Sequence, residues 1–154
     1  MKKTALGFTL IELLVAVGIG LILVAGGLAA YKGMGEKQKV KQAGVTFETN
    51  LRLFRQKAMS GEKPAGCEFL QNYTVTYTDS SSYTVQAMCS TGTPGSTTFT
   101  LGEGVLFTGA GFGDIIFLTL KTWIDSVKTI TLKAGSYSYE VNIEKGGVIS
   151  GKML

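Results

Sequence analysis

The side chains that most often perform catalysis are scarce or scattered in this sequence. The 154-residue chain contains no histidine, which is the most common general base and zinc ligand in proteins. It has no phosphate-binding loop, no dinucleotide-binding glycine fingerprint and no calcium-loop spacing. The acidic residues Glu103, Asp114, Asp125 and Glu140 are spread apart along the chain. We therefore expect no enzyme activity, no cofactor and no bound metal.

One carboxylate has unusual surroundings. Residues 8–31 contain a single charged residue, Glu12, in an otherwise apolar run. A helix over this run is about 36 Å long, enough to cross a hydrocarbon core of about 30 Å. A charge inside a membrane helix costs roughly 2.5–3.5 kcal/mol on insertion scales and is functional by default. If the chain is cut after Gly7, the new amino group of Phe8 lies one helical turn from Glu12. The amine and the carboxylate can then neutralise each other, within one chain or between neighbouring chains.

The run GFTLIELLV, residues 7–15, lies behind a short basic leader. It resembles the type III signal sequence of type IV pilins and of the pseudopilins of type II secretion, and the resemblance covers residues 2 to about 31. In that family a prepilin peptidase cleaves after the glycine and methylates the new N-terminal phenylalanine. The resemblance implies cleavage after Gly7, methylation of Phe8, and contact of Glu12 with the N-terminus of a neighbouring subunit during assembly.

The resemblance also implies a location and partners. The chain would cross the cytoplasmic membrane once, with its C-terminal head outside the cytosol, and would then move into a pilus or pseudopilus. Its partners would be the prepilin peptidase, other pilin or pseudopilin subunits, and the membrane. The short chain, the β-rich region after the helix and the lack of a long C-terminal cysteine loop resemble the minor, H-type subunits of type II secretion.

Two other interpretations of the N-terminal run stay open. The small residues at positions 27–30 suit an ordinary signal peptidase, which would release an exported domain, or an exported enzyme, that begins near Tyr31. An uncleaved signal anchor would instead hold the chain at the membrane. The positive-inside rule does not decide the orientation, because lysines flank both ends of the run.

The helical pattern continues beyond the apolar run to about residue 60. Apolar residues recur at spacings of three and four, which places them in one stripe: Val40, Ala43, Phe47, Leu51, Phe54 and Ala58. The polar residues Lys41, Glu48, Arg52 and Arg55 fall on other faces. Gly61 and Pro64 end the helix. We predict a leader over 1–7, a transmembrane half over 8–31, an amphipathic half over 32–60 and a globular head over 61–154.

After Pro64 the pattern changes to short strands. Residues 73–78 and 83–89 alternate with period two, and the polar residues 79–82 between them predict a hairpin. Further strands are predicted at 97–101, 114–120, 127–132, 137–143 and 147–150, with glycine-rich connections. Residues 102–113 are expected to form a flexible loop. The predicted fold class is therefore α+β and pilin-like, with one long N-terminal helix packed on an antiparallel sheet or on two small sheets.

The two cysteines follow two of these predicted elements. Cys67 lies just past the helix and Cys89 ends the second strand. Two cysteines outside the cytosol usually form a disulfide, which would stabilise the head by about 3 kcal/mol. The alternative is a pair of buried free thiols.

The formal net charge of +4 raises a second class of function, a DNA- or surface-binding minor pilin. Some minor pilins bind DNA through a basic C-terminal tail, and the resemblance makes Lys145 and Lys152 the candidate contacts here. Phosphate binding rests on clustered cations. The lysines of the C-terminal half alternate with acidic residues, so a solvated surface is the simpler interpretation.

Overall fold

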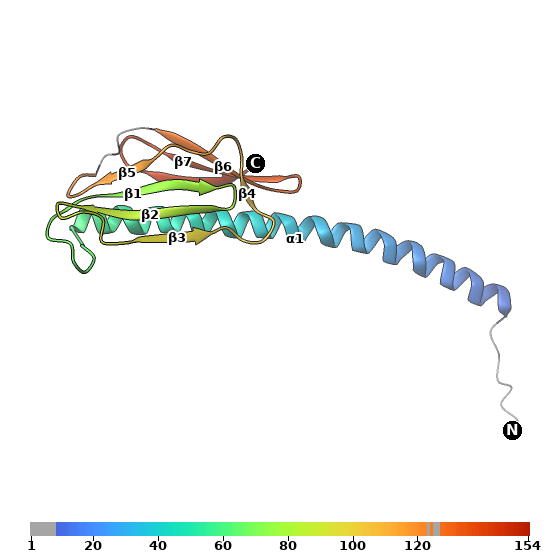
Figure 1. Ribbon diagram of the computed structural model, residues 1–154. Helices are drawn as coiled ribbons and strands as arrows, with labels where there is room; N and C mark the ends of the chain where they lie inside the picture. The colour runs from blue at the N-terminus through green and yellow to red at the C-terminus, as the bar shows by residue number, and fades with distance from the viewer. Residues whose placement is uncertain (1–8, 123, 125–126) are drawn as a thin grey trace, which may run out of the picture. The chain divides into compact units, whose positions relative to one another are not determined.

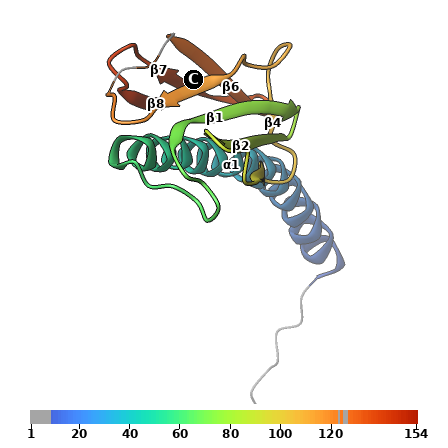
Figure 2. The same ribbon diagram turned by 60° about the vertical axis from the view of Figure 1, so that its left-hand side comes forward.

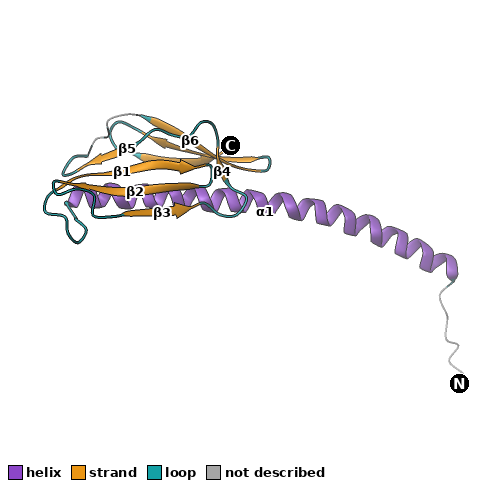
Figure 3. Cartoon of the chain, in the orientation of Figure 1, coloured by secondary structure: helices purple, strands orange, loops and turns teal. Residues whose placement is uncertain are grey.

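The computed structural model describes residues 9–122, 124 and 127–154, with the side chains of residues 25–33 left aside. The protein is α+β: one long N-terminal helix packs on two antiparallel sheets (Figure 1). The chain divides into two units, Met1–Gly35 and Glu36–Leu154. The second, called the globular unit below, contains both sheets and the C-terminal half of the helix, as the colouring by element type in Figure 3 makes clear.

One helix and eight strands make up the described part of the chain. Helix α1 spans Leu10–Ser60. The strands are β1 (Leu70–Asp79), β2 (Ser82–Cys89), β3 (Ser96–Thr100), β4 (Leu106–Phe107), β5 (Ile115–Leu118), β6 (Lys128–Ala134), β7 (Tyr137–Ile143) and β8 (Ile149–Met153). Sheet A has the strand order β3-β2-β1-β5, and sheet B has the order β4-β6-β7-β8. All pairings within the two sheets are antiparallel.

The hairpin of β1 and β2 is closed by a turn that Asp79 organises. One oxygen of the Asp79 carboxylate accepts hydrogen bonds from the backbone N–H of Ser81 at 2.7 Å and from its hydroxyl at 2.9 Å. The other accepts a hydrogen bond from the Ser82 hydroxyl at 2.6 Å. The hydrogen bond from the Ser82 side chain contributes most to holding the pKa of Asp79 below its ordinary value, and the bonds from Ser81 add to the effect. The turn therefore carries a fixed negative charge in water at neutral pH.

The core lies between α1 and the two sheets, and Phe47 is at its centre. The Phe47 ring is fully buried. It contacts Tyr83 of sheet A at a centroid distance of 4.8 Å and Phe107 of sheet B at 5.4 Å. Figure 2 shows the C-terminal half of α1 running along the strands that carry these rings. One aromatic side chain of the helix thus joins both sheets.

The C-terminal end of α1 is fixed by backbone hydrogen bonds. Gly61 donates to the carbonyl of Ala58 at 3.1 Å, and Glu62 donates to the carbonyl of Lys57 at 2.9 Å, which together form a Schellman motif. The backbone N–H of Leu120 adds a third bond, to the Ala58 carbonyl at 3.0 Å. The last carbonyls of the helix therefore have partners from the turn and from the segment that follows β5.

Gly44 lets the helix approach sheet B closely. A Cβ atom at this position would overlap the ring of Tyr139, which is on β7 and almost fully buried. By helix propensity alone, a glycine at position 44 would only weaken the helix. Its role in the fold is instead to leave room for an aromatic ring.

The predicted fold class is confirmed. The predicted stripe is confirmed as well: Val40, Ala43, Phe47, Leu51 and Ala58 are buried, and Phe54 is half-buried. Glu48, which the sequence places on another face than the stripe, is nevertheless only 8% exposed, and its carboxylate binds the buried Tyr139. The flexible loop expected over 102–113 is partly wrong. It contains β4, whose neighbour Val105 and own residue Phe107 are buried, and a two-residue strand is too short to show periodicity.

Alanine in place of glycine normally stabilises a helix. The contact between Gly44 and Tyr139 predicts the opposite effect at position 44. Gly44→Ala should lower the free energy of unfolding by about 1–3 kcal/mol, because overpacking outweighs a propensity gain of about 1 kcal/mol. Urea unfolding of the full chain in detergent, followed by near-ultraviolet circular dichroism, measures this. Gly35→Ala is the matched control, because its Cβ would meet nothing within 4 Å. Equal stability of the two variants would contradict the packing role.

Candidate functional site

The N-terminal motif begins outside the described residues. Gly7 and Phe8 both lie there, so cleavage after Gly7 and methylation of Phe8 stay predictions. The structure describes the chain from Thr9, and α1 begins at Leu10. Glu12 is in the first turn of the helix and is exposed.

Thr9 and Glu12 cap the start of α1. The backbone N–H of Glu12 donates to the Thr9 hydroxyl oxygen at 3.3 Å, and that hydroxyl donates to the Glu12 carboxylate at 3.5 Å. The N–H of Leu13 donates to the Thr9 carbonyl at 3.2 Å. A threonine with a glutamate three residues later is the capping-box pattern, and an acid in the first turn suits the helix dipole. The T-x-x-E spacing of residues 9–12 is the sequence signal for this second, local role of Glu12.

The first half of α1 exposes its apolar side chains. Eleven large apolar residues between positions 10 and 24 are exposed, for example Leu10 at 81% and Ile22 at 74%. Glu12 is the one charged residue in this stretch. An apolar surface of this extent marks a contact with lipid or with another protein. The first half of the helix is therefore the strongest candidate for an interaction site.

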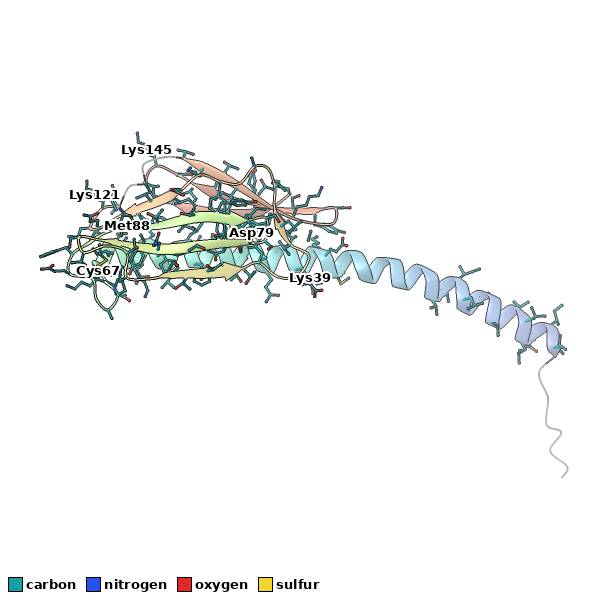
Figure 4. All side chains as sticks on the ribbon, in the orientation of Figure 1. Lys39, Cys67, Asp79, Met88, Lys121 and Lys145 are labelled. Atoms are coloured by element: carbon teal, nitrogen blue, oxygen red, sulfur yellow. A yellow bond between two sulfur atoms is a disulfide. The ribbon has the colours of Figure 1, made fainter. Side chains whose placement is uncertain are left out.

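A disulfide ties the segment after the helix to the end of β2. Cys67 and Cys89 are bonded across a sequence separation of 22, and both side chains are buried. Figure 4 shows Cys67 at the end of the globular unit where α1 ends. Asp79 lies at the opposite end in the same view. We call these the Cys67 end and the Asp79 end.

A partly buried polar network joins the helix to sheet B. Glu48 accepts a hydrogen bond from the Tyr139 hydroxyl at 3.1 Å and forms an ion pair with Arg52. Arg52 also donates to the carbonyl of Ile149 on β8 at 2.7 Å. Burial, with the nearby Glu48 charge, raises the pKa of Tyr139 above its ordinary value. The i, i+4 spacing of Glu48 and Arg52 is visible in the sequence, but their buried partner on β7 is not.

The two candidate DNA contacts lie far apart on the sheet. Lys145 is in the connection between β7 and β8 at the Cys67 end, as Figure 4 shows. Lys152 is near the other end of β8, opposite Glu140 in the register, and its amine lies 3.1 Å from that carboxylate. The structure therefore does not bring these lysines together, and DNA binding stays a prediction without a cluster to support it.

The described residues offer neither a metal-binding cluster nor a helix that could cross a membrane. These residues contain no group of three or more histidine, cysteine, aspartate or glutamate side chains placed to hold a metal ion. No helix within them has both the length and the apolar character that a membrane crossing requires.

The comparisons with known proteins bear on the N-terminus alone. Residues 2–28 match a family model described as the prokaryotic N-terminal methylation motif. The chain therefore carries a prepilin-type signal that includes Gly7, Phe8 and Glu12. No curated protein and no solved structure matches the chain.

The disulfide predicts a measurable loss of stability on reduction. The double variant Cys67→Ala, Cys89→Ala should lose about 2–4 kcal/mol of unfolding free energy, because the unfolded chain is no longer cross-linked. Urea unfolding of the oxidised wild type and of the double variant gives the difference. Wild type in excess reductant is the control and should resemble the variant. No effect of reductant on the wild type would contradict the prediction.

Three tyrosines predict a loss of stability in alkali. Burial raises the pKa values of Tyr73, Tyr83 and Tyr139, so the unfolded chain ionises first, near the ordinary value of 10.0. The stability that these tyrosines contribute is fully present below about pH 10. It is lost as the pH rises through their pKa values in the folded chain. Urea unfolding between about pH 8 and pH 11 should show stability falling, with a shallower fall in Tyr139→Phe. Stability that rises over this range would contradict the assignment.

Proposed function

We propose that this chain is a structural subunit of a type IV pilus or of a type II secretion pseudopilus. Two observations support the proposal. The prepilin-type methylation motif covers residues 2–28. Directly behind its start, the described part of α1 presents an apolar surface with a single carboxylate. The second observation carries the proposal, because such a surface needs a lipid or protein partner in every state of the chain.

The proposed sequence of events is mechanical. Residues 8–31 anchor the chain in the cytoplasmic membrane with the globular unit outside the cytosol. Prepilin peptidase cleaves after Gly7 and methylates Phe8. The apolar half of α1 then leaves the lipid and packs against the same half of neighbouring subunits, so that apolar contacts are exchanged for apolar contacts. The narrower role of a minor, H-type subunit, which the short chain and the β-rich globular unit resemble, stays a prediction.

Glu12 has a specific part in this proposal. Between packed apolar helices its charge needs a partner. The α-amino group that cleavage creates at Phe8 of a neighbour supplies one. The capping role of Glu12 is a competing explanation, because a cap acts within one chain and needs no neighbour. The two roles respond differently to substitution, since a cap needs hydrogen-bonding atoms whereas an ion pair needs the charge.

Substitutions at Thr9 and Glu12 separate these roles. Glu12→Ala and Glu12→Gln should both leave cleavage after Gly7 intact and reduce incorporation into sheared filaments by about tenfold or more, because both remove the charge. Thr9→Ala is the matched control: it removes the cap and keeps the carboxylate, so incorporation should persist. Mass spectrometry reads the N-terminus, and immunoblotting of the filament fraction reads incorporation.

Two results of this experiment would count against the proposal. Normal incorporation of Glu12→Gln together with loss in Thr9→Ala would assign Glu12 to capping alone. Absence of the wild-type chain from every filament fraction, despite normal expression, would remove the structural-subunit role itself.

A further inference from the structure

The last turns of α1 and the start of β8 form an open groove at the Cys67 end. Its volume is about 670 Å³. Arg52, Arg55 and Met59 line the helix side, and Val148 and Ile149 line the strand side. Met59 and Val148 are exposed large apolar residues in the groove. The groove therefore combines an apolar surface with two guanidinium groups.

Within the part of the chain that the structure describes, Arg55 is the cation of this groove that has no counter-charge. Arg52 is already paired with Glu48. Among the described residues, no carboxylate lies within ion-pair distance of Arg55. Its guanidinium makes one long hydrogen bond, 3.4 Å to the carbonyl of Thr122, and its buried Nε has no partner. An arginine with donors to spare beside apolar side chains fits a carboxylate partner.

The groove borders a corner with further unusual features. Leu120, bonded to the Ala58 carbonyl, has a φ of 58°, which is rare for a residue other than glycine. Its side chain is 76% exposed. The hydroxyl of the adjacent Thr119 is buried without a partner in the described part of the chain. Backbone strain and unpaired polar atoms of this kind gather at contact sites.

The opposite, Asp79 end of the globular unit presents a matching carboxylate. Glu103 occupies the tip of the turn between β3 and β4, where the N–H of Val105 donates to the carbonyl of Gly102 at 3.0 Å. Gly104 has a φ of +77°, as the third residue of a type II turn requires. Glu103 is exposed, and no cation among the described residues pairs with it.

The Glu103 turn is held firmly to the sheet. Leu101 donates to the carbonyl of Ser81 and Phe107 donates to that of Ser80, each at 2.7 Å, so both arms rest on the β1–β2 hairpin. Val105 is fully buried and anchors the tip. Leu106, which begins β4 three residues after Glu103, is 47% exposed and adds an apolar side chain to this region. Tip and groove therefore offer complementary groups: carboxylate to guanidinium, and Leu106 to Met59 and Val148.

We propose that the groove at the Cys67 end binds the Glu103 turn of a second copy of this chain. Arg55 pairs with the partner's Glu103, and Leu106 of the second copy lies against Met59 and Val148. The two surfaces lie at opposite ends of one globular unit, so the contact is heterologous and repeats from copy to copy. An interface of this type builds an open filament. The inference rests on the proposed function and adds the contact that joins neighbouring globular units.

Zero-length cross-linking tests the pairing directly. Arg55→Lys keeps the charge and places an amine that a carbodiimide can couple to a carboxylate. Full-length chain carrying this variant is treated with carbodiimide in the sheared filament fraction and in the membrane fraction. Mass spectrometry should find a peptide cross-linked between positions 55 and 103, with mixed heavy and light isotopes when labelled and unlabelled copies are combined. Adding Glu103→Gln should abolish it.

Charge reversal gives an independent readout. Arg55→Glu should reduce incorporation into filaments by about tenfold or more, because like charges then meet. Combining it with Glu103→Arg should restore incorporation. Lys41→Glu, which changes an exposed lysine of α1 that belongs neither to the groove nor to the Glu103 turn, is the control for net charge and should incorporate normally.

The outcomes separate this inference from the proposed function. A chain found in filaments that shows no link between positions 55 and 103 in either fraction, or no rescue by charge reversal, overturns the inference alone. A chain absent from filaments refutes the proposed function, and the membrane fraction still decides the pairing. A link from position 55 only to another protein also overturns the inference.

Discussion

Burial of one apolar face of α1 is the constraint on which the rest of the structure depends. Phe47 contacts Tyr83 of sheet A and Phe107 of sheet B, so neither sheet has a complete core without the helix. Gly44 brings the helix backbone against Tyr139, and the Tyr139 hydroxyl reaches the carboxylate of Glu48. The same helix begins with a run of apolar side chains that nothing in the described chain covers. The second half of the helix therefore lies against a protein core, whereas the first half exposes an apolar surface that, in our proposal, lipid or neighbouring subunits cover.

This division separates the proposed assembly surface on the first half of α1 from the proposed contact between the opposite ends of neighbouring globular units. The first half of α1 offers apolar area with the single charge of Glu12, which suits close packing of many copies. The globular unit is fixed at one end by the disulfide and the helix cap, and at the other by the Asp79 hairpin turn. Both ends are held firmly enough to present defined surfaces, the groove around Arg55 and the turn that carries Glu103. The surfaces that we propose to carry the function are therefore the two ends of the globular unit and the first half of α1.

Much of this fold follows from local sequence patterns. The helix, its buried stripe and the first hairpin were predicted, because apolar spacing records directly which face is buried. What could not be predicted depends on contacts between distant segments. Glu48 has the spacing of a surface residue, and only the position of β7 explains its burial. The proposed pairing of Arg55 with Glu103 of a second copy could not be predicted either, because it depends on the fold placing the end of α1 and the connection between β3 and β4 at opposite ends of the globular unit. The need for glycine at position 44 could not be predicted either, because it arises from the ring of Tyr139, far along the chain.

The central claim is that this chain is processed and assembled as a prepilin-class subunit. The most direct test is the mass of the mature N-terminal peptide from a membrane fraction of the native host. A chain that begins at methylated Phe8 is the result that the proposal predicts. A chain that begins near Tyr31, or that still begins at Met1, would contradict it and would leave an exported or simply anchored α+β domain.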